Sequence, residues 1–162
     1  MPIPGYKKAE AVVLWSGNAD LIVFEIFSCH NDIITKVVVP DGVEKILSSC
    51  FYECDNLTEV ILPDSITEIG DFCFEKCKSL NQINMPSNLE YLGENAFYET
   101  ISLRKVSFSE GLKNIYRYTF AESGIEEVSL PDSLEYIGYG AFENTNLKKV
   151  VIPEKVESLY QA

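Results

Sequence analysis

The sequence predicts a β-rich repeat solenoid, a fold in which short units coil one after another around a common interior. Hydrophobic residues followed by proline recur at intervals of 23, 23, 45 and 22 residues, at Pro40, Pro63, Pro86, Pro131 and Pro153. The long interval divides into 23 and 22 if Ser109 stands in the proline position. The twelfth residue of every unit is a phenylalanine, namely Phe51, Phe74, Phe97, Phe120 and Phe142. One such unit has too few apolar residues to enclose a core alone, so the units must stack.

Each unit of 22–23 residues is expected to hold one parallel strand. In the segment from Leu57 to Leu62, apolar and exposed residues alternate towards its end, which is typical of a strand. Pro63 then ends the strand, because proline has no N–H group for the sheet. Positions 9 to 15 of the unit favour a short helical or 3-10 turn on the opposite face. In the stack, equivalent side chains form interior columns about 4.7–4.9 Å apart.

The two ends of the chain differ from the central units. Residues 1–33 are expected to form an N-terminal hairpin cap, since two apolar runs between Ala11 and Phe27 are separated by a turn-forming segment, with Trp15 in the hairpin core. Residues 34–162 comprise a half unit, five full units and a truncated sixth unit that begins at Pro153. Because this last unit stops at Ala162, we expect either a fragment of a longer protein or end-to-end association with another chain.

The repeat also resembles a known family. The pattern L-x-x-[VI]-x-[LM]-P-x-x-[VIL]-x-x-[IL]-G-x-x-[AC]-F-x-x-[CT] is similar to the BspA-type, or Treponema-type, leucine-rich repeat from about Ile34 to the C-terminus. The resemblance implies a curved right-handed solenoid used for protein binding, in bacterial surface proteins and in some eukaryotic microbes. The asparagine ladder of the common leucine-rich repeat is missing, so the turn after each strand must satisfy its backbone differently. Its place is taken by Gly42, Ser65, Asn88, Gly111 and Ser133.

Composition argues against several classes of partner. The chain of 162 residues has 25 acidic and 13 basic side chains and a net charge of −12, which repels a phosphate backbone and argues against nucleic acid. The apolar run from Leu21 to Phe27 contains Glu25 and is far shorter than the ~20 residues of a membrane-spanning helix, so no membrane insertion is expected. The run from Ala11 to Trp15 is shorter than the ~7–15 residues of a signal-peptide core. The cytoplasm is therefore slightly favoured, and the cell surface if the parent protein is longer.

Five cysteines are present, and four of them occupy equivalent places in the repeat. Cys50 with Cys54 and Cys73 with Cys77 stand at positions 11 and 15, where other units carry small residues such as Ala96. We favour packing over zinc binding, since zinc ligand pairs usually have tighter spacing. A bridge between stacked cysteines is geometrically conceivable, and the prediction is five free thiols.

No catalytic site is predicted. His30, the sole histidine, follows Cys29, but adjacent side chains on an extended chain point to opposite faces, so a Cys–His nucleophile is disfavoured against a surface histidine. No phosphate-binding loop, nucleophile motif or catalytic carboxylate pair is recognised. We therefore expect no enzyme, no cofactor and no metal.

The outward positions of the strands predict a binding surface on the concave face. Position 20 carries Lys36, Glu59, Gln82, Lys105, Glu127 and Lys149, and position 19 carries Thr35, Thr58, Asn81, Arg104, Glu126 and Lys148. Arg104, Lys105, Lys148 and Lys149 form a basic cluster that Glu126 and Glu127 interrupt. One hypothesis is that this cluster docks an acidic partner. The alternative is that mixed charges only keep the sheet soluble.

Tyrosines predict a second surface. Tyr91 and Tyr136 share position 6, and the turn that follows carries Tyr116, Tyr118 and Tyr139. Tyrosine often anchors protein interfaces. Its ring can also cover the edge of a solenoid while its hydroxyl contacts water, and that alternative stays open.

Together these features predict a non-catalytic protein–protein interaction module that presents a rigid, curved repeat surface to a protein partner. Two alternatives remain: a cell-surface adhesin domain that binds a host or matrix protein, and a regulatory repeat segment of a larger protein.

Overall fold

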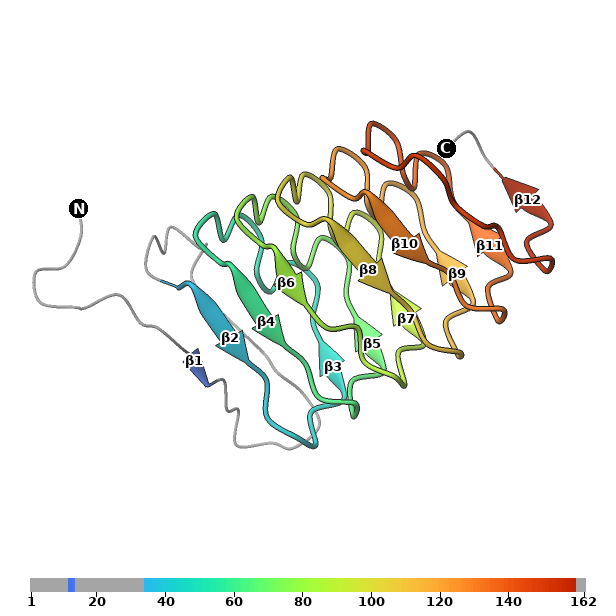
Figure 1. Cartoon of the computed structure of the whole chain (residues 1–162). Helices are drawn as coiled ribbons and strands as arrows, with labels where there is room; N and C mark the ends of the chain where they lie inside the picture. Colours follow the sequence, from blue (N-terminus) through green and yellow to red (C-terminus); the bar gives the residue numbers. More distant parts are fainter. Residues whose placement is uncertain (1–11, 14–33, 160–162) are drawn as a thin grey trace, which may run out of the picture.

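The chain forms a parallel β-solenoid with two rows of short strands (Figure 1). The computed structural model describes residues 12–13 and 34–159. The first row consists of β1 (Val12–Val13), β2 (Lys36–Val38), β4 (Glu59–Ile61), β6 (Gln82–Ile83), β8 (Lys105–Ser107) and β10 (Glu127–Ser129). The second row consists of β3 (Lys45–Ile46), β5 (Glu68–Ile69), β7 (Tyr91–Leu92), β9 (Asn114–Ile115), β11 (Tyr136–Ile137) and β12 (Ser158–Leu159).

The strand register confirms the predicted repeat length. In the first row Lys36 pairs with Glu59, which pairs with Gln82, and further along Lys105 pairs with Glu127. Partners are therefore 22 or 23 residues apart, as the proline spacing predicts. The prediction of one strand per unit is incomplete, because every full unit contributes a second strand at positions 6 and 7. These strands have only two residues, which is too short to produce a visible alternation in the sequence.

The segment at positions 9 to 15 is not helical, which corrects the expectation of a helical or 3-10 turn. The N–H groups of Ser49, Phe51 and Glu53 donate to carbonyls of the next unit, at 2.8, 2.8 and 2.9 Å. The residues between them donate to carbonyls three residues back in their own unit. Because every second N–H group leaves the segment, a continuous helix, whose bonds stay within one segment, cannot form.

Two residues per unit adopt the left-handed backbone conformation that these overlapping turns require. They stand at positions 10 and 14, and most of them are not glycine. The non-glycine residues are Ser49, Glu53, Phe72, Lys76, Asn95, Glu99, Tyr118, Glu122 and Asn144, with φ between 53° and 59°. Each costs conformational energy, of the order of 1–2 kcal/mol, which the cross-unit hydrogen bonds and the buried core must offset.

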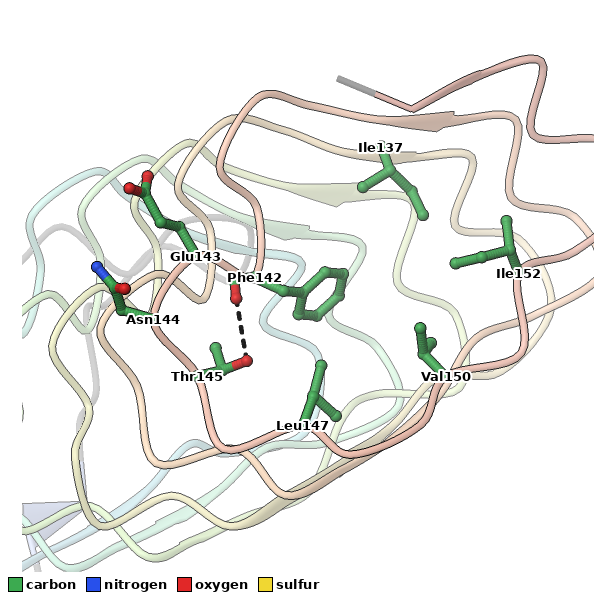
Figure 2. Close-up of a pocket in the computed structure, with 8 residues that line it drawn as sticks. All are labelled: Ile137, Phe142, Glu143, Asn144, Thr145, Leu147, Val150 and Ile152. Carbon is green, nitrogen blue, oxygen red and sulfur yellow. Dashed lines mark hydrogen bonds between the residues drawn. The ribbon is translucent and has the colours of Figure 1, made fainter. Parts of the chain in front are cut away.

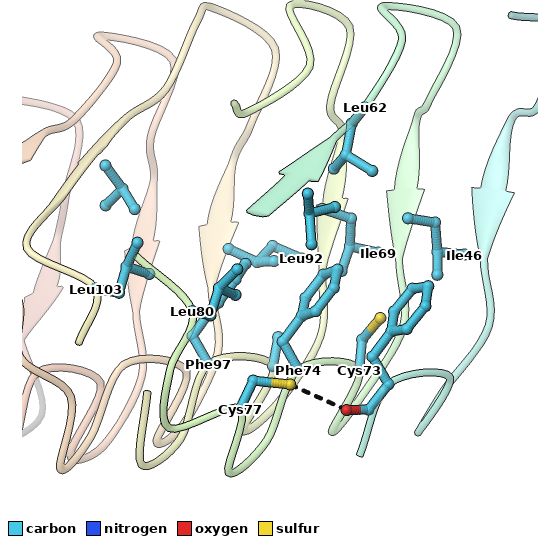
Figure 3. Close-up of a cluster of buried hydrophobic side chains, with 14 of the residues drawn as sticks. Ile46, Leu62, Ile69, Cys73, Phe74, Cys77, Leu80, Leu92, Phe97 and Leu103 are labelled. Atoms are coloured by element: carbon cyan, nitrogen blue, oxygen red, sulfur yellow. Dashed lines mark hydrogen bonds between the residues drawn. The ribbon is translucent and has the colours of Figure 1, made fainter. Parts of the chain in front are cut away.

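The phenylalanines form the central column of the core, as predicted. Neighbouring rings of Phe51, Phe74, Phe97 and Phe120 are stacked with centroids 5.2, 5.2 and 5.3 Å apart, and Phe142 follows at 5.5 Å. Figure 3 shows Phe74 and Phe97 among the isoleucines and leucines of adjacent columns. Each ring is thus covered by equivalent rings from the neighbouring units, which is the enclosure that a single unit cannot provide.

The four cysteines of the repeat pack in this core. Cys50, Cys54, Cys73 and Cys77 are buried within the hydrophobic core. The Cys77 thiol donates to the carbonyl oxygen of Phe51 at 3.0 Å (Figure 3). Burial raises the pKa of the Cys73 thiol, with its neighbours Cys50 and Cys54 adding to the effect. The expectation of packing at these positions is confirmed.

Serine hydroxyls satisfy the turn after the strand in place of the missing asparagine ladder. The Ser65 hydroxyl accepts from the Gly42 N–H at 3.1 Å and donates to the Val43 carbonyl at 2.7 Å. Ser133 makes the same two bonds to Gly111 and to the Leu112 carbonyl, at 3.0 and 2.9 Å. The side chain of one unit therefore completes the turn of the preceding unit.

At the N-terminal end, β1 pairs in parallel with β2 and extends the first row by one strand. The rest of the predicted hairpin lies outside the described residues, as do Trp15, Cys29 and His30. At the other end β12 pairs with β11, so the sixth unit starts as a further coil. The part of the chain that is described holds no helix of the length and apolarity that crossing a bilayer requires.

Candidate interaction surfaces

The outward charges of the first strand row pair with one another across units. Lys36 Nζ lies 2.8 Å from a Glu59 carboxylate oxygen, and Lys105 Nζ lies 2.8 Å from Glu127. Both pairs join residues that the strand register places side by side. These pairs are partly or largely exposed to water, where an ion pair contributes little to stability. The row is therefore a mixed-charge surface with fixed spacing.

The predicted basic cluster is divided by these contacts. Arg104 Nε lies 3.6 Å from the Glu126 carboxylate, and an Arg104 Nη1 donates to the Gly124 carbonyl at 3.1 Å. Because Lys105 is paired with Glu127, two of the four basic residues, Arg104 and Lys105, already have acidic partners. Lys148 and Lys149 are exposed, and within residues 34–157 neither forms an ion pair. The docking of an acidic partner remains a prediction for these two lysines.

The first strand row is interrupted between β6 and β8, and Asn84, which follows β6, bonds through its side chain to the unit on the β4 side. Its side-chain oxygen accepts from the Leu62 N–H at 2.8 Å, and its amide nitrogen donates to the Leu62 carbonyl at 2.6 Å. The side chain thus takes the place of a third paired residue in β6. A shallow groove of about 350 Å³ lies there, and it includes the predicted surface residues Glu59, Gln82 and Lys105. Sequence reasoning missed Asn84, although a polar amide at position 22, where β2 and β4 carry Val38 and Ile61, was a visible signal.

The structure places the five tyrosines of the predicted aromatic surface in a row of three rings and a pair of rings. The Tyr91 and Tyr116 ring centroids are 5.4 Å apart, and those of Tyr116 and Tyr136 are 6.4 Å apart. Tyr118 and Tyr139 form an edge-to-face pair at 5.5 Å. We call these five residues the tyrosine patch. They come from three consecutive units, so stacking of the units is what creates the patch.

Polar contacts fix the patch in place. The Tyr91 hydroxyl donates to Asp71 Oδ1 at 2.9 Å. Burial, followed by this hydrogen bond, raises the pKa of Tyr91. Arg117 Nε donates to Glu94 Oε2 at 2.8 Å, and that bond is the largest cause of the raised pKa of Arg117. Tyr118 and Tyr136 make smaller contributions to the raised pKa of Arg117.

The core is open at the last full unit. A cavity of about 390 Å³ is lined by Ile137, Phe142, Leu147 and Ile152, whose side chains converge in Figure 2. The Thr145 hydroxyl donates to the Phe142 carbonyl at 3.0 Å at its edge. Ile137 and Phe142 belong to the hydrophobic core, and Leu147 and Ile152 pack against it. Across the described ranges, no group of three or more histidine, cysteine or acidic side chains is placed to hold a metal ion.

Comparison with known proteins agrees with this architecture. A family model described as the BspA type leucine rich repeat region matches in 6 copies, over residues 21–132 and 44–162. No curated protein matches the chain by sequence.

Several solved structures are similar. A leucine rich repeat protein of T. pallidum is 32% identical over 74% of this chain, with a TM-score of 0.68. A leucine-rich repeat protein from Bacteroides ovatus is 28% identical over 78% of the chain, with a TM-score of 0.74. A leucine rich cell surface protein from Faecalibacterium prausnitzii is 25% identical over 96%, with a TM-score of 0.71. The matched parts are 59%, 36% and 40% of those three chains, so each of them is longer than the region that it shares with this one.

Proposed function

The chain belongs to the BspA-type leucine-rich repeat family, and we propose that it is a non-catalytic protein-binding module whose principal contact surface is the tyrosine patch. The observation that carries the proposal is that five tyrosines from three units form two groups of rings in contact, with centroids 5.4 and 6.4 Å apart in the row Tyr91–Tyr116–Tyr136 and 5.5 Å apart in the pair Tyr118–Tyr139. Tyrosine rings supply large apolar contact area, and their hydroxyls supply hydrogen bonds at the same surface.

The solenoid favours binding because the patch is ordered before a partner arrives. The backbone beneath it is held by cross-unit hydrogen bonds, such as Phe97 N–H to the Thr119 carbonyl at 2.8 Å and Phe120 N–H to the Ala141 carbonyl at 2.8 Å. Side chains on such a scaffold lose little conformational freedom on association, which lowers the entropic cost of binding. Tyr139 is about half exposed and is available for contact.

The first strand row is the weaker candidate surface. A partner that contacted Lys105 and Glu127 would have to replace an ion pair that is already formed at 2.8 Å. Exposed ion pairs of this kind contribute only about 0–1 kcal/mol to stability. Because such charges are already paired, few groups of the row would form an additional interaction with a partner. The row therefore serves as the matched control surface in the experiment below.

Quantitative affinity capture from native extract tests the proposal. The immobilised wild-type chain is compared with a Tyr116→Ser/Tyr139→Ser variant and with a Lys105→Ala/Glu127→Ala variant on the strand row. We expect a set of proteins that the wild type and the strand-row variant retain and that the tyrosine variant loses. Capture of the same proteins in equal amounts by all three chains would refute the role of the patch, and loss only with the strand-row variant would transfer the function there.

Display on the cell surface, as an adhesin-type module, is a second proposal, and it is supported by the similarity to the cell surface protein from Faecalibacterium prausnitzii. Labelling of intact cells with a membrane-impermeant reagent tests it. The chain should be labelled without lysis, together with a known surface protein and without a cytosolic one. Labelling only after lysis would exclude surface display and would favour a regulatory segment of a larger protein.

A further inference from the structure

One lysine of the solenoid occupies a small site made by the preceding unit. Lys76 Nζ lies 3.0 Å from the Tyr52 hydroxyl and 3.2 Å from Glu53 Oε1, and it lies over the Tyr52 ring, 5.2 Å from its centroid. Tyr52 and Glu53 stand at positions 13 and 14 of their unit, and Lys76 stands at position 14 of the next. Hydrogen bonding to Tyr52 and then to Glu53 raises the pKa of Lys76, so the ammonium form is favoured there.

Two units further along, the same site recurs without its lysine. Tyr98 and Glu99 stand at positions 13 and 14, and the residue at position 14 of the following unit is Glu122. The backbone is equivalent: the Glu53 N–H donates to the next unit at 2.9 Å and the Glu99 N–H at 3.0 Å, with φ of 58° and 56° at these two residues. The second site therefore offers the same hydroxyl, ring and carboxylate, with a second carboxylate where the first site has an ammonium group.

Neither carboxylate of this second site is paired with a cation within residues 34–157. Glu122 Oε1 accepts from Asn144 Nδ2 at 2.6 Å, which leaves its other oxygen available. Burial, and then the charges of Glu99 and Glu122, raise the pKa of Tyr98. In the first site, the group that interacts with the equivalent hydroxyl and carboxylate is a lysine ammonium.

We propose that Tyr98, Glu99 and Glu122 form a binding site for a lysine side chain of a protein partner. This inference rests on the proposed binding function and adds the chemistry that the partner must carry. An ammonium group suits the site because it can donate to the hydroxyl and to both carboxylates while lying over the ring. A basic partner also matches the net charge of −12.

A substitution that supplies the lysine internally tests the chemistry of the site. Glu122→Lys should reproduce the contact that Lys76 makes and raise the midpoint of thermal unfolding by about 1–3 °C at low salt. Glu122→Gln, which removes the negative charge without adding a cation, is the matched control and should give a smaller rise. If Glu122→Lys melted at or below the temperature of Glu122→Gln, the site would not accept an ammonium group.

A titration with a defined probe tests binding in trans. The pentapeptide Gly-Gly-Lys-Gly-Gly with blocked termini is added to the full chain, and the Tyr98 ring resonances are followed by NMR. We expect shifts that grow with peptide concentration, that are absent with the acetyl-lysine peptide and that disappear in Glu122→Lys, where the site is filled. Equal shifts with both peptides, or shifts that persist in Glu122→Lys, would overturn the proposal. This result is independent of the capture experiment, because the tyrosine patch contains none of these three residues.

Discussion

Replacement of Phe97 by alanine is the most direct test of the stacked core. The Phe97 ring is fully buried and lies between Phe74 at 5.2 Å and Phe120 at 5.3 Å. Truncation of a buried phenylalanine costs about 3–5 kcal/mol, and aromatic contacts contribute about 0.5–1.5 kcal/mol each beyond the buried area. Since two such contacts are lost, we expect a decrease of about 4–5 kcal/mol in the free energy of unfolding.

Urea denaturation followed by circular dichroism measures this change, and Phe72 and Phe142 provide graded controls. Phe72 is 38% exposed, so Phe72→Ala should cost less than about 1 kcal/mol. Phe142 is 8% exposed and has one ring neighbour in the column, so Phe142→Ala should cost about 3 kcal/mol. Equal losses for Phe97→Ala and Phe72→Ala would refute the reasoning, because burial and stacking would then contribute nothing measurable.

Three further predictions concern the turns, the charges and the thiols. Ser49 has a φ of 59°, so Ser49→Gly should raise the free energy of unfolding by about 0.5–1 kcal/mol. Ser48→Gly, at an exposed neighbour without this conformation, should lower it. A change in the same direction for both variants in urea denaturation would contradict the argument. Burial raises the pKa of Glu75, so its charged form opposes folding above that pKa. Glu75→Gln should therefore be more stable than the wild type at pH 7. In a series of thermal melts this difference should vanish below about pH 4, since Glu75 is then protonated in both the folded and the unfolded chain. A difference that is unchanged down to pH 3 would refute this. Thiol titration under denaturing, non-reducing conditions should count five free thiols, because the four cysteines of the repeat are buried among core residues; a count of three would instead indicate one disulfide.

The sequence allowed the column residues to be predicted because each column repeats one chemical requirement in every unit. The five phenylalanines at position 12 and the small residues at position 11 are recognisable by comparison of the chain with itself. The second strand row could not be predicted in this way. A strand such as Glu68–Ile69 has only two residues, one partly exposed and one buried, and so short a pair gives no periodic signal.

The turn at positions 9 to 15 shows a second limit. Its composition, with Phe72, Lys76 and Glu99 among the left-handed residues, does not favour a positive φ at any of them. The conformation is imposed by hydrogen bonds to the neighbouring unit, which no local pattern reveals. The surfaces, too, were only partly predictable. The grouping of the tyrosines followed from their positions in the repeat, but the pairing of Lys105 with Glu127 and the site at Tyr98 depend on which units are adjacent.

Both strand rows are interrupted at one level of the solenoid, where the coils are joined by the turn side and the core. No strand pairing joins β6 to β8 or β7 to β9, yet Phe97 N–H and Glu99 N–H still donate across that level, to Thr119 and Ala121. The turn side and the stacked rings of Phe97 and Phe120, 5.3 Å apart, therefore carry the continuity of the superhelix at this level. Tyr91 and Tyr116 belong to the two coils that meet there, so the geometry of the tyrosine patch depends on the contacts of the turns and not on strand pairing.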